Sequence, residues 1–336
     1  MTEDLVSDQG LWFRVETSST ASAVRRAAER LGGQLHLGAR RTADLAIVAA
    51  ELTSNLVKHA EDGVILLRPV RRDSEAGVEL VAVDSGPGMA DLTVSSRDGH
   101  STTGTLGIGL GAITRQASWY DGYSRPGRGT VFAVQVWPAA APQPTWFAGL
   151  TRPLTGETRC GDGFAARTVD GRPQLLLCDG LGHGPLAAGA TDAAVAAFRN
   201  APPGSPKTVV EHLHRSLSHT RGAALAVAEL DPAAAKLRYA GLGNIAGTVV
   251  EDDRRRGLVS LPGIAGHQRP VVREYDYPFG GNALLVMHTD GVADRWRLAE
   301  YPGLVERAPL LVAATVLRDC GVRRDDAGVL VARAPA

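Results

Sequence analysis

The chain has 336 residues, of which 44% are hydrophobic and 21% are charged. A single core stops growing at about 250–300 residues, so this length predicts two domains. Lysine and arginine number 36 and aspartate and glutamate number 36, so no net charge attracts nucleic acid or an anionic membrane, and we expect a folded protein or a small molecule as partner.

The first part of the chain alternates strands with helices. Apolar periodicity predicts a strand at 11–16, helices at 20–31 and 43–60, strands at 64–70 and 78–84, a helix at 109–117 and a strand at 129–136. This order predicts an α/β layer in which the helices cover one sheet.

A proline-rich segment separates the two halves of the chain. Residues 137–153 (WPAAAPQPTWFAGLTRP) hold four prolines, a composition that resists helix and central strand. We therefore expect a first domain at 9–138, a linker at 139–153 and a second domain at 154–334.

The second half is richer in strands. We expect strands at 163–168 and 174–179, helices at 185–200 and 206–217, strands at 223–231, 236–241, 245–251 and 283–288, a helix at 308–320 and a strand at 328–333. Many antiparallel-compatible strands with few helices predict a sandwich of sheets covered by helices.

The cysteines and the apolar runs bear on the compartment. Cys160, Cys178 and Cys320 are odd in number and have no C-x-x-C spacing, which predicts neither a disulfide framework nor a thiolate zinc site. The longest apolar runs fall far short of the ~20 residues that span a bilayer, and the N-terminus carries acids where a signal peptide has positive charge. We expect a cytoplasmic protein with reduced thiols and no membrane contact.

Two polar residues lie beside the apolar stripe of the helix expected at 43–60. Glu51 and Asn55 are four residues apart and therefore share one helix face. An amide oxygen can ligate Mg²⁺, and a carboxylate can accept a proton from an attacking hydroxyl. A solvated helix face produces the same pattern, so the pair gains meaning only from the motifs that follow it.

An aspartate and two glycines follow the strand expected at 78–84. Asp84, Gly86 and Gly88 form the sequence D-S-G-P-G, a turn that only small residues permit. An aspartate at this place can accept a hydrogen bond from the exocyclic amine of adenine. An ordinary turn closed by the aspartate side chain is the alternative.

A glycine-rich run opens the helix expected at 109–117. In residues 104–111 (GTLGIGLG), bare backbone N–H groups and the helix N-terminus can hold phosphates. The run is not a Walker A loop because no Gly-Lys-Ser/Thr follows, and it lacks the preceding strand and the acidic residue of a Rossmann fingerprint.

In this order the three motifs resemble the GHKL ATPase and histidine-kinase superfamily. The phrases ELTSNLVKHA, DSGPGM and LGIGLGAITRQAS are similar to the RsbT- and RsbW-type serine kinases of bacterial partner-switching systems. The resemblance covers about 11–137 and implies a Bergerat-type α/β sandwich that binds ATP with one Mg²⁺. It implies that Glu51 is the general base, Asn55 the Mg²⁺ ligand and Asp84 the adenine contact. The implied nucleotide cradle is Gly86, Gly88, Gly104, Gly107 and Gly109.

Aspartates recur in the second half where expected strands meet loops. They are Asp162, Asp179, Asp290 and the pair Asp325-Asp326. Carboxylates at strand ends can converge on one edge of a sandwich, where oxygen ligands suit Mg²⁺ or Mn²⁺. Two such ions can hold a hydroxide for in-line attack on a phosphate, so no protein nucleophile is required. Each Asp-Gly taken alone is also compatible with a simple turn.

The ordered motifs GDGF, DGLGHG, TDG and DD resemble the SpoIIE- and RsbX-type branch of metal-dependent Ser/Thr protein phosphatases, over about 154–334. The resemblance implies an αββα sandwich and a two-ion site. The implied ligands are Asp162, Asp179, Asp290, Asp325 and the carbonyl oxygen of Gly180. Asp326 could replace Asp325 in this set. Gly328 departs from the pattern, because such phosphatases commonly carry Thr there, and we expect looser support of the ligands.

Together the two resemblances imply a bifunctional partner-switching regulator. Its first site would phosphorylate Ser or Thr on a STAS-domain antagonist or stressosome-type protein, and its second site would remove that phosphate. Two alternatives stay open. One is an active phosphatase whose ATP-binding domain is a sensor, and the other is an anti-sigma factor that sequesters a sigma subunit.

Overall fold

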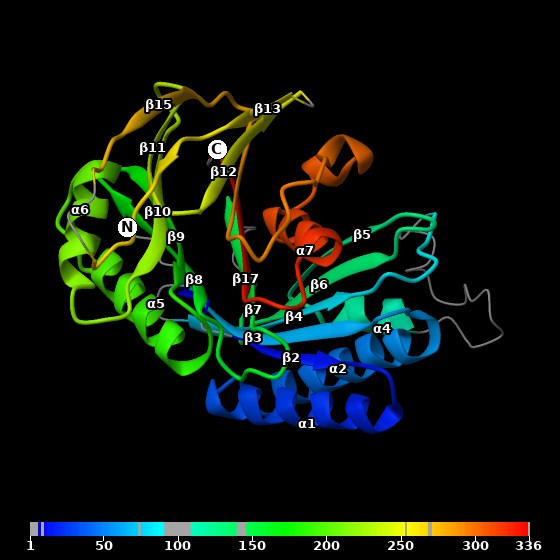
Figure 1. Ribbon diagram of the computed structural model, residues 1–336. Helices are drawn as coiled ribbons and strands as arrows, with labels where there is room; N and C mark the ends of the chain where they lie inside the picture. Colours follow the sequence, from blue (N-terminus) through cyan, green and yellow to red (C-terminus); the bar gives the residue numbers. More distant parts are fainter. Residues whose placement is uncertain are drawn as a thin grey trace. The chain divides into compact units, whose positions relative to one another are not determined.

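The computed structural model describes residues 6–7, 10–72, 75–90, 109–139, 146–252, 254–267 and 271–334. The chain divides into two compact units, whose elements are labelled in Figure 1. The N unit contains Leu5–Pro144 and Glu306–Arg318, and the C unit contains Met1–Asp4, Thr145–Val305 and Asp319–Ala336. Each unit is described separately below.

The N unit is built on one antiparallel sheet with the order β1-β3-β4-β6-β5, in which β2 also pairs with β3. Its strands are β1 (Val6–Ser7), β2 (Leu11–Arg14), β3 (Val64–Arg72), β4 (Glu75–Val83), β5 (Trp119–Ser124) and β6 (Thr130–Val136). Its helices are α1 (Ser18–Gln34), α2 (Ala39–His59) and α4 (Gly109–Gln116). Figure 1 shows α1 and α2 along one face of this sheet.

The core of the N unit lies between these helices and the sheet. Leu45, Val48 and Leu52 of α2 are buried in one cluster with alternate residues of the strands, such as Ile65 and Leu67 of β3. A helical stripe against one face of an alternating strand is the packing that the apolar periods predict. The predicted α/β layer is confirmed.

A segment from late in the chain is grouped with the N unit. Helix α7 (Pro309–Cys320) follows Ala308, whose backbone N–H donates to Asp121 of β5 at 3.0 Å. Near the other end of α7, Arg318 donates to the backbone oxygen of Asp84 at 3.2 Å. Most of the helix that we expected inside the second domain therefore packs within the N unit.

The C unit contains two sheets. The first has the order β14-β11-β10-β9-β8 with β15 also paired to β11, and the second has the order β13-β12-β16-β17-β7. The strands of the first are β8 (Asp162–Val169), β9 (Arg172–Gly180), β10 (Ala223–Asp231), β11 (Lys236–Leu242), β14 (Ser260–Leu261) and β15 (Tyr275–Pro278). Those of the second are β7 (Phe147–Arg152), β12 (Ala246–Glu251), β13 (Arg254–Gly257), β16 (Leu284–His288) and β17 (Ala327–Arg333).

The two sheets pack on each other, and helices cover the first sheet. Strand β17 contacts β8 and β9, helix α5 (Gly184–Arg199) lies on β8 and β9, and helix α6 (Pro206–Ser216) lies on β10 and β11. Short 3₁₀ helices at Leu298–Glu300 and Leu304–Glu306 complete the set of described helices. The mixed α/β fold class with a sheet sandwich in the second half is confirmed.

Strands β1, β5, β7, β13, β14 and β15 were not predicted from the sequence, and the reason is clear for two of them. Strand β7 lies inside the segment expected to be a linker, because the prolines of that segment flank Phe147–Arg152 and none falls within it. It pairs only with β17, as an edge strand. Strand β5 contains Asp-Gly, which favours a turn, and its pairing with β6 overrides that local preference.

Other expectations concern cysteines and membranes. The three cysteines are buried, and among the described residues none forms a disulfide. Within the described ranges, no helix is long and apolar enough to cross a membrane.

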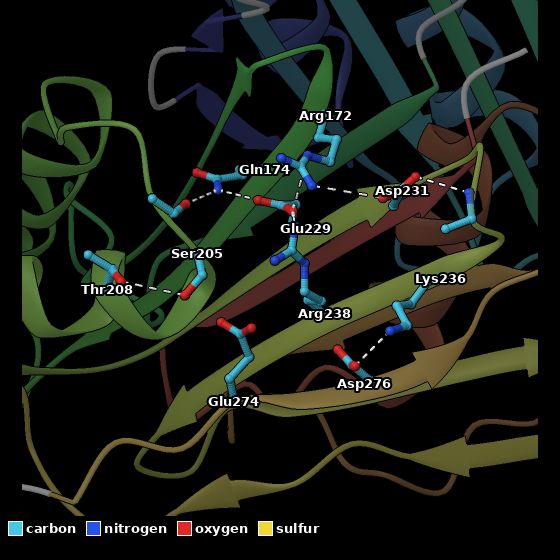
Figure 2. Close-up of polar contacts among 12 residues, drawn as sticks. Arg172, Gln174, Ser205, Thr208, Glu229, Asp231, Lys236, Arg238, Glu274 and Asp276 are labelled. Carbon is cyan, nitrogen blue, oxygen red and sulfur yellow. Dashed lines mark hydrogen bonds and ion pairs between the residues drawn. The ribbon is translucent and has the colours of Figure 1, made fainter.

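A row of charged and polar side chains crosses the first sheet of the C unit (Figure 2). Glu229 of β10 is only 3% exposed, accepts a hydrogen bond from Gln174 of β9 at 2.6 Å and pairs with Arg238 of β11. Arg167 of β8 donates to Gln174 at 3.0 Å and to the backbone oxygen of Phe198 at 2.9 Å. This polar row therefore ties four strands to the end of α5.

Replacing Glu229 with Leu is expected to lower the free energy of unfolding by about 3 kcal/mol. Removing one partner of a buried ion pair leaves the other charge uncompensated, and Arg238 is partly exposed, which places the cost at the low end of the usual range. Chemical denaturation measures the change. The matched control is Asp276→Ala, whose ion pair with Lys236 is about half exposed (52% and 45%) and should contribute less than about 1 kcal/mol. Equal losses in both variants would contradict a structural role for the polar row.

Candidate active sites

Helix α2 places the first two predicted site residues on one face. Glu51 and Asn55 are half-buried, and neither has a hydrogen-bond partner within the described part of the chain. Their helix packs against α4, which begins at Gly109. Both side chains therefore lie on one face of a helix that packs against α4. Gly104 and Gly107 lie outside the described residues.

Asp84 follows β4 and is fixed by its backbone. Its N–H donates to the carbonyl of Thr130 at 2.9 Å, and its Oδ1 accepts from the N–H of Gly86 at 2.8 Å, which closes a turn. Burial raises the pKa of Asp84, and the hydrogen bond from Gly86 opposes that rise. The hydrogen bond from Gly86 uses Oδ1, so Oδ2 keeps lone pairs that can accept a hydrogen bond from a ligand.

The glycines of this turn allow close approach of neighbouring backbone. A Cβ on Gly86 would lie 2.9 Å from the carbonyl oxygen of His59, one turn beyond Asn55 on α2. A Cβ on Gly88, whose φ is +65°, would lie 2.0 Å from the carbonyl oxygen of Arg125. The turn that carries Asp84 therefore packs against the end of the helix that carries Glu51.

In the C unit, two of the predicted metal ligands face each other across neighbouring strands. Asp162 of β8 is directly opposite Asp179 of β9, so their Cβ atoms lie on one face about 4.5–5.5 Å apart. Asp162 is 1% exposed, and its Oδ2 accepts a hydrogen bond from the hydroxyl of Thr289 at 2.7 Å. Its Oδ1 is buried and has no hydrogen-bond partner in the structure as described.

The TDG and DD motifs meet beside each other in the C unit. A Cβ on Gly291 would lie 1.8 Å from the carbonyl oxygen of Asp326, so only glycine fits there. Asp290 accepts a hydrogen bond from the side-chain amide of Asn244 at 2.7 Å. Asn244 lies in the turn between β11 and β12, and the sequence prediction had not singled it out.

The neighbouring aspartates Asp325 and Asp326 differ in exposure and in hydrogen bonding. Asp326 is 3% exposed, and its two oxygens accept the backbone N–H groups of Leu154 at 2.7 Å and Gly161 at 2.9 Å. Its carboxylate therefore holds the segment that precedes Asp162. Asp325 is more exposed and uses Oδ1 for one hydrogen bond, from the N–H of Asp326. The geometry favours Asp325 as the ligand.

Gly180 is required by the packing of α5. A Cβ at this position would lie 2.2 Å from the carbonyl oxygen of Ala187, so the helix backbone lies against the strand end. The N–H of Gly180 donates to the carbonyl of Gly161 at 3.0 Å, next to Asp162. Its role as a carbonyl ligand stays a prediction.

The electrostatics of these aspartates suit a cation. Burial, with repulsion from Asp290 and Asp325, raises the pKa of Asp179 to about 7. Burial and the charge of Asp179 raise the pKa of Asp162 well above its ordinary value. Repelling carboxylates and the unpartnered Oδ1 of Asp162 fit hard divalent ions such as Mg²⁺ or Mn²⁺. Across the described ranges no three Asp, Glu, His or Cys side chains already form a metal-holding group, so the ligand set stays a prediction.

Metal-free protein should lose stability between pH 5 and pH 7.5 relative to its Asp179→Asn variant. A carboxyl group with a raised folded pKa contributes stability that is fully present below its unfolded pKa of about 4. That contribution is lost as the pH rises through about 7, the folded value for Asp179. Thermal unfolding in EDTA at the two pH values measures the effect. An equal change in Tm between the two pH values for wild type and Asp179→Asn would contradict this explanation.

Each half of the chain matches the model of a known family. Residues 13–134 match the model of the histidine kinase-like ATPase domain, and residues 169–335 match that of stage II sporulation protein E (SpoIIE). Serine/threonine-protein kinase RsbT of Bacillus subtilis (strain 168) is 29% identical over 124 residues, which are 37% of this chain and 93% of RsbT.

Two solved structures resemble one half of the chain. A structure from work described as "The bacterial stressosome: a modular system that has been adapted to control secondary messenger signaling" is 30% identical, with a TM-score of 0.51, and the match covers 56% of this chain and 98% of that one. RsbX in complex with magnesium is 17% identical, with a TM-score of 0.46, over 55% of this chain and 92% of that one.

Proposed function

The chain combines a histidine kinase-like ATPase domain with a SpoIIE phosphatase domain, and from this premise we propose that it sets the phosphorylation level of a STAS-domain protein. The ATPase domain transfers phosphate to a Ser or Thr of the target, and the phosphatase domain removes it. The observation that carries the proposal is the facing pair Asp162 and Asp179, with one buried carboxylate oxygen left without a partner.

In the phosphatase site, the aspartates hold divalent cations and the rest of the unit holds the aspartates. Such ions neutralise the charge of a phosphate ester and lower the pKa of a bound water. Asp162 and Asp179 supply the buried side of the site. Asp290 and Asp325 supply the more exposed side, where a phosphorylated side chain can enter.

In the ATP site, three side chains have separate tasks. The Oδ2 atom of Asp84 accepts a hydrogen bond from the adenine amine, and Asn55 binds the Mg²⁺ that accompanies ATP. Glu51 accepts the proton of the target hydroxyl as that oxygen attacks the terminal phosphate. Similarity to RsbT over most of its length supports transfer to a protein serine or threonine. The same similarity, with the stressosome-related structure, supports a STAS-domain target.

The test uses the full-length protein and two assays. The first follows Mn²⁺-dependent hydrolysis of a generic phosphate monoester, and the second follows labelled phosphate from ATP into a panel of STAS-domain proteins of the same organism. We expect turnover in the first assay, and labelling of one STAS protein that the phosphatase reverses when Mn²⁺ is added. Hydrolysis without labelling would favour a phosphatase with an ATP-binding sensor domain. Capture of a sigma factor with neither activity would favour the anti-sigma alternative.

A further inference from the structure

The hydroxyl of Thr289 is the centre of a short hydrogen-bond chain in the C unit. The backbone N–H of Gly328 donates to Oγ1 of Thr289 at 2.9 Å, and Oγ1 donates to Oδ2 of Asp162 at 2.7 Å. Thr289 is fully buried, and Asp162 is 127 residues away in sequence. The chain therefore joins the ends of β16 and β17 to the first residue of β8.

The hydroxyl of Thr289 has one donor and two acceptor lone pairs. One lone pair accepts the N–H of Gly328, and the proton is donated to the carboxylate of Asp162. The backbone of Thr289 is also held, because its N–H donates to the carbonyl of Gly328 at 3.1 Å and its carbonyl accepts from Val292 at 3.1 Å. The hydroxyl therefore reaches Asp162 from a rigid position and orients the carboxylate with Oδ1 left over.

The glycine that departs from the phosphatase pattern lies beside this hydrogen bond. A Cβ on Gly328 would lie 3.2 Å from Oδ2 of Asp162 and 3.4 Å from the methyl carbon of Thr289. Thr289, at the neighbouring strand end, supplies a hydroxyl to Asp162. The expected looser support of the ligands at Gly328 stays a prediction.

We infer that Thr289 is a positioning residue of the metal site, which orients Asp162 so that Oδ1 faces the ion. The inference rests on the proposed phosphatase function. Thr289 acts through Asp162 and does not itself contact the ion or the phosphate. Groups that orient metal ligands in this way typically change metal affinity or activity by about 10–100-fold when they are removed.

The test is Mn²⁺ binding to the metal-free full-length protein, measured by titration calorimetry. Thr289→Val keeps the shape and removes the hydroxyl, and we expect Mn²⁺ affinity to fall about 10–100-fold. Thr289→Ser restores the donor and is expected to stay within about threefold of wild type, whereas Thr289→Cys, a weak donor, should fall between them. The KM for a phosphate monoester at saturating Mn²⁺ should not change, because Thr289 does not contact substrate.

The control is Thr248→Val, the same change at a buried threonine of β12, whose strand pairs with β16. It should bind Mn²⁺ like wild type, which separates a loss of positioning from a general loss of packing. Should Thr289→Val unfold, the Ser and Cys variants still decide the question, because only a positioning hydroxyl orders Mn²⁺ affinity by donor strength. If Thr289→Val or Thr289→Cys binds Mn²⁺ as tightly as wild type, the inference about Thr289 fails while the phosphatase function stands. If the wild-type protein itself neither binds Mn²⁺ nor hydrolyses the ester, the phosphatase function fails as well.

Discussion

Asp179→Asn is expected to reduce Mn²⁺-dependent hydrolysis of a phosphate monoester by about a thousandfold. An amide in place of this carboxylate removes one negative charge from the facing pair with Asp162, so the site holds divalent ions weakly and neutralises the phosphate poorly. A loss of about 4 kcal/mol in transition-state stabilisation corresponds to this factor. Initial rates over a Mn²⁺ titration measure it, and excess Mn²⁺ should restore only a small part of the activity.

Stability separates this result from simple unfolding. The raised pKa of Asp179 means that its charge destabilises the metal-free fold near neutral pH, so the variant should be more heat-stable than wild type in EDTA. Activity and metal-free stability are then expected to change in opposite directions, as at other functional sites where strain serves activity. Asp276→Asn, an exposed aspartate paired with Lys236, is the control that should change neither property. Retention of Mn²⁺-dependent turnover in Asp179→Asn would remove Asp179 from the ligand set.

The elements of the fold that the sequence predicts well are those with a strong local signal. Helix α2 and the long strands β9, β10 and β17 lie within a few residues of their predicted ranges. The helix has an apolar stripe of helical period, and the three strands are continuous apolar runs that are buried on both faces. Strands β5 and β7 escaped prediction, because their local residues favour a turn or a linker. Only pairing with distant strands makes them extended.

The candidate sites also combine features that local sequence predicts with features that depend on distant residues. Motif order selects the candidate aspartates, but it does not predict that Asp162 and Asp179 are in register, since register depends on pairing across the whole sheet. Thr289, Asn244 and Asp326 support the predicted site through contacts between residues far apart in sequence. No spacing rule finds such contacts.

In the N unit, the contact between Arg318 and Asp84 is another that no local sequence pattern predicts. The guanidinium donates to the backbone oxygen of Asp84 across 234 residues of sequence, and its charge also opposes the burial that raises the pKa of Asp84. Nothing in the three nucleotide-binding motifs predicts a residue of α7 at this turn. The proposed ATP site therefore includes a contact from a helix in the second half of the sequence.

Glu51→Gln is expected to abolish phosphate transfer to the STAS-domain target while leaving ATP binding nearly unchanged. The amide keeps the size of the side chain but cannot accept the proton of the attacking hydroxyl, and a positioned general base typically contributes about 10²–10⁴ in rate. Binding depends instead on Asp84 and Asn55, so Asp84→Asn should weaken ATP binding itself. Calorimetry with ATP measures the first property, and transfer of labelled phosphate measures the second.

The Glu51 variant also decides between a kinase and a sensor. Glu29→Gln is the matched control, because Glu29 of α1 pairs with exposed Arg25 and lies outside the motifs. If wild type and Glu29→Gln label the target and Glu51→Gln does not, the ATPase domain is a kinase with Glu51 as its base. If all three bind ATP and none transfers phosphate, the domain is a nucleotide sensor. In both cases Mn²⁺-dependent hydrolysis should persist in Glu51→Gln, since its chemistry depends on aspartates of the C unit alone.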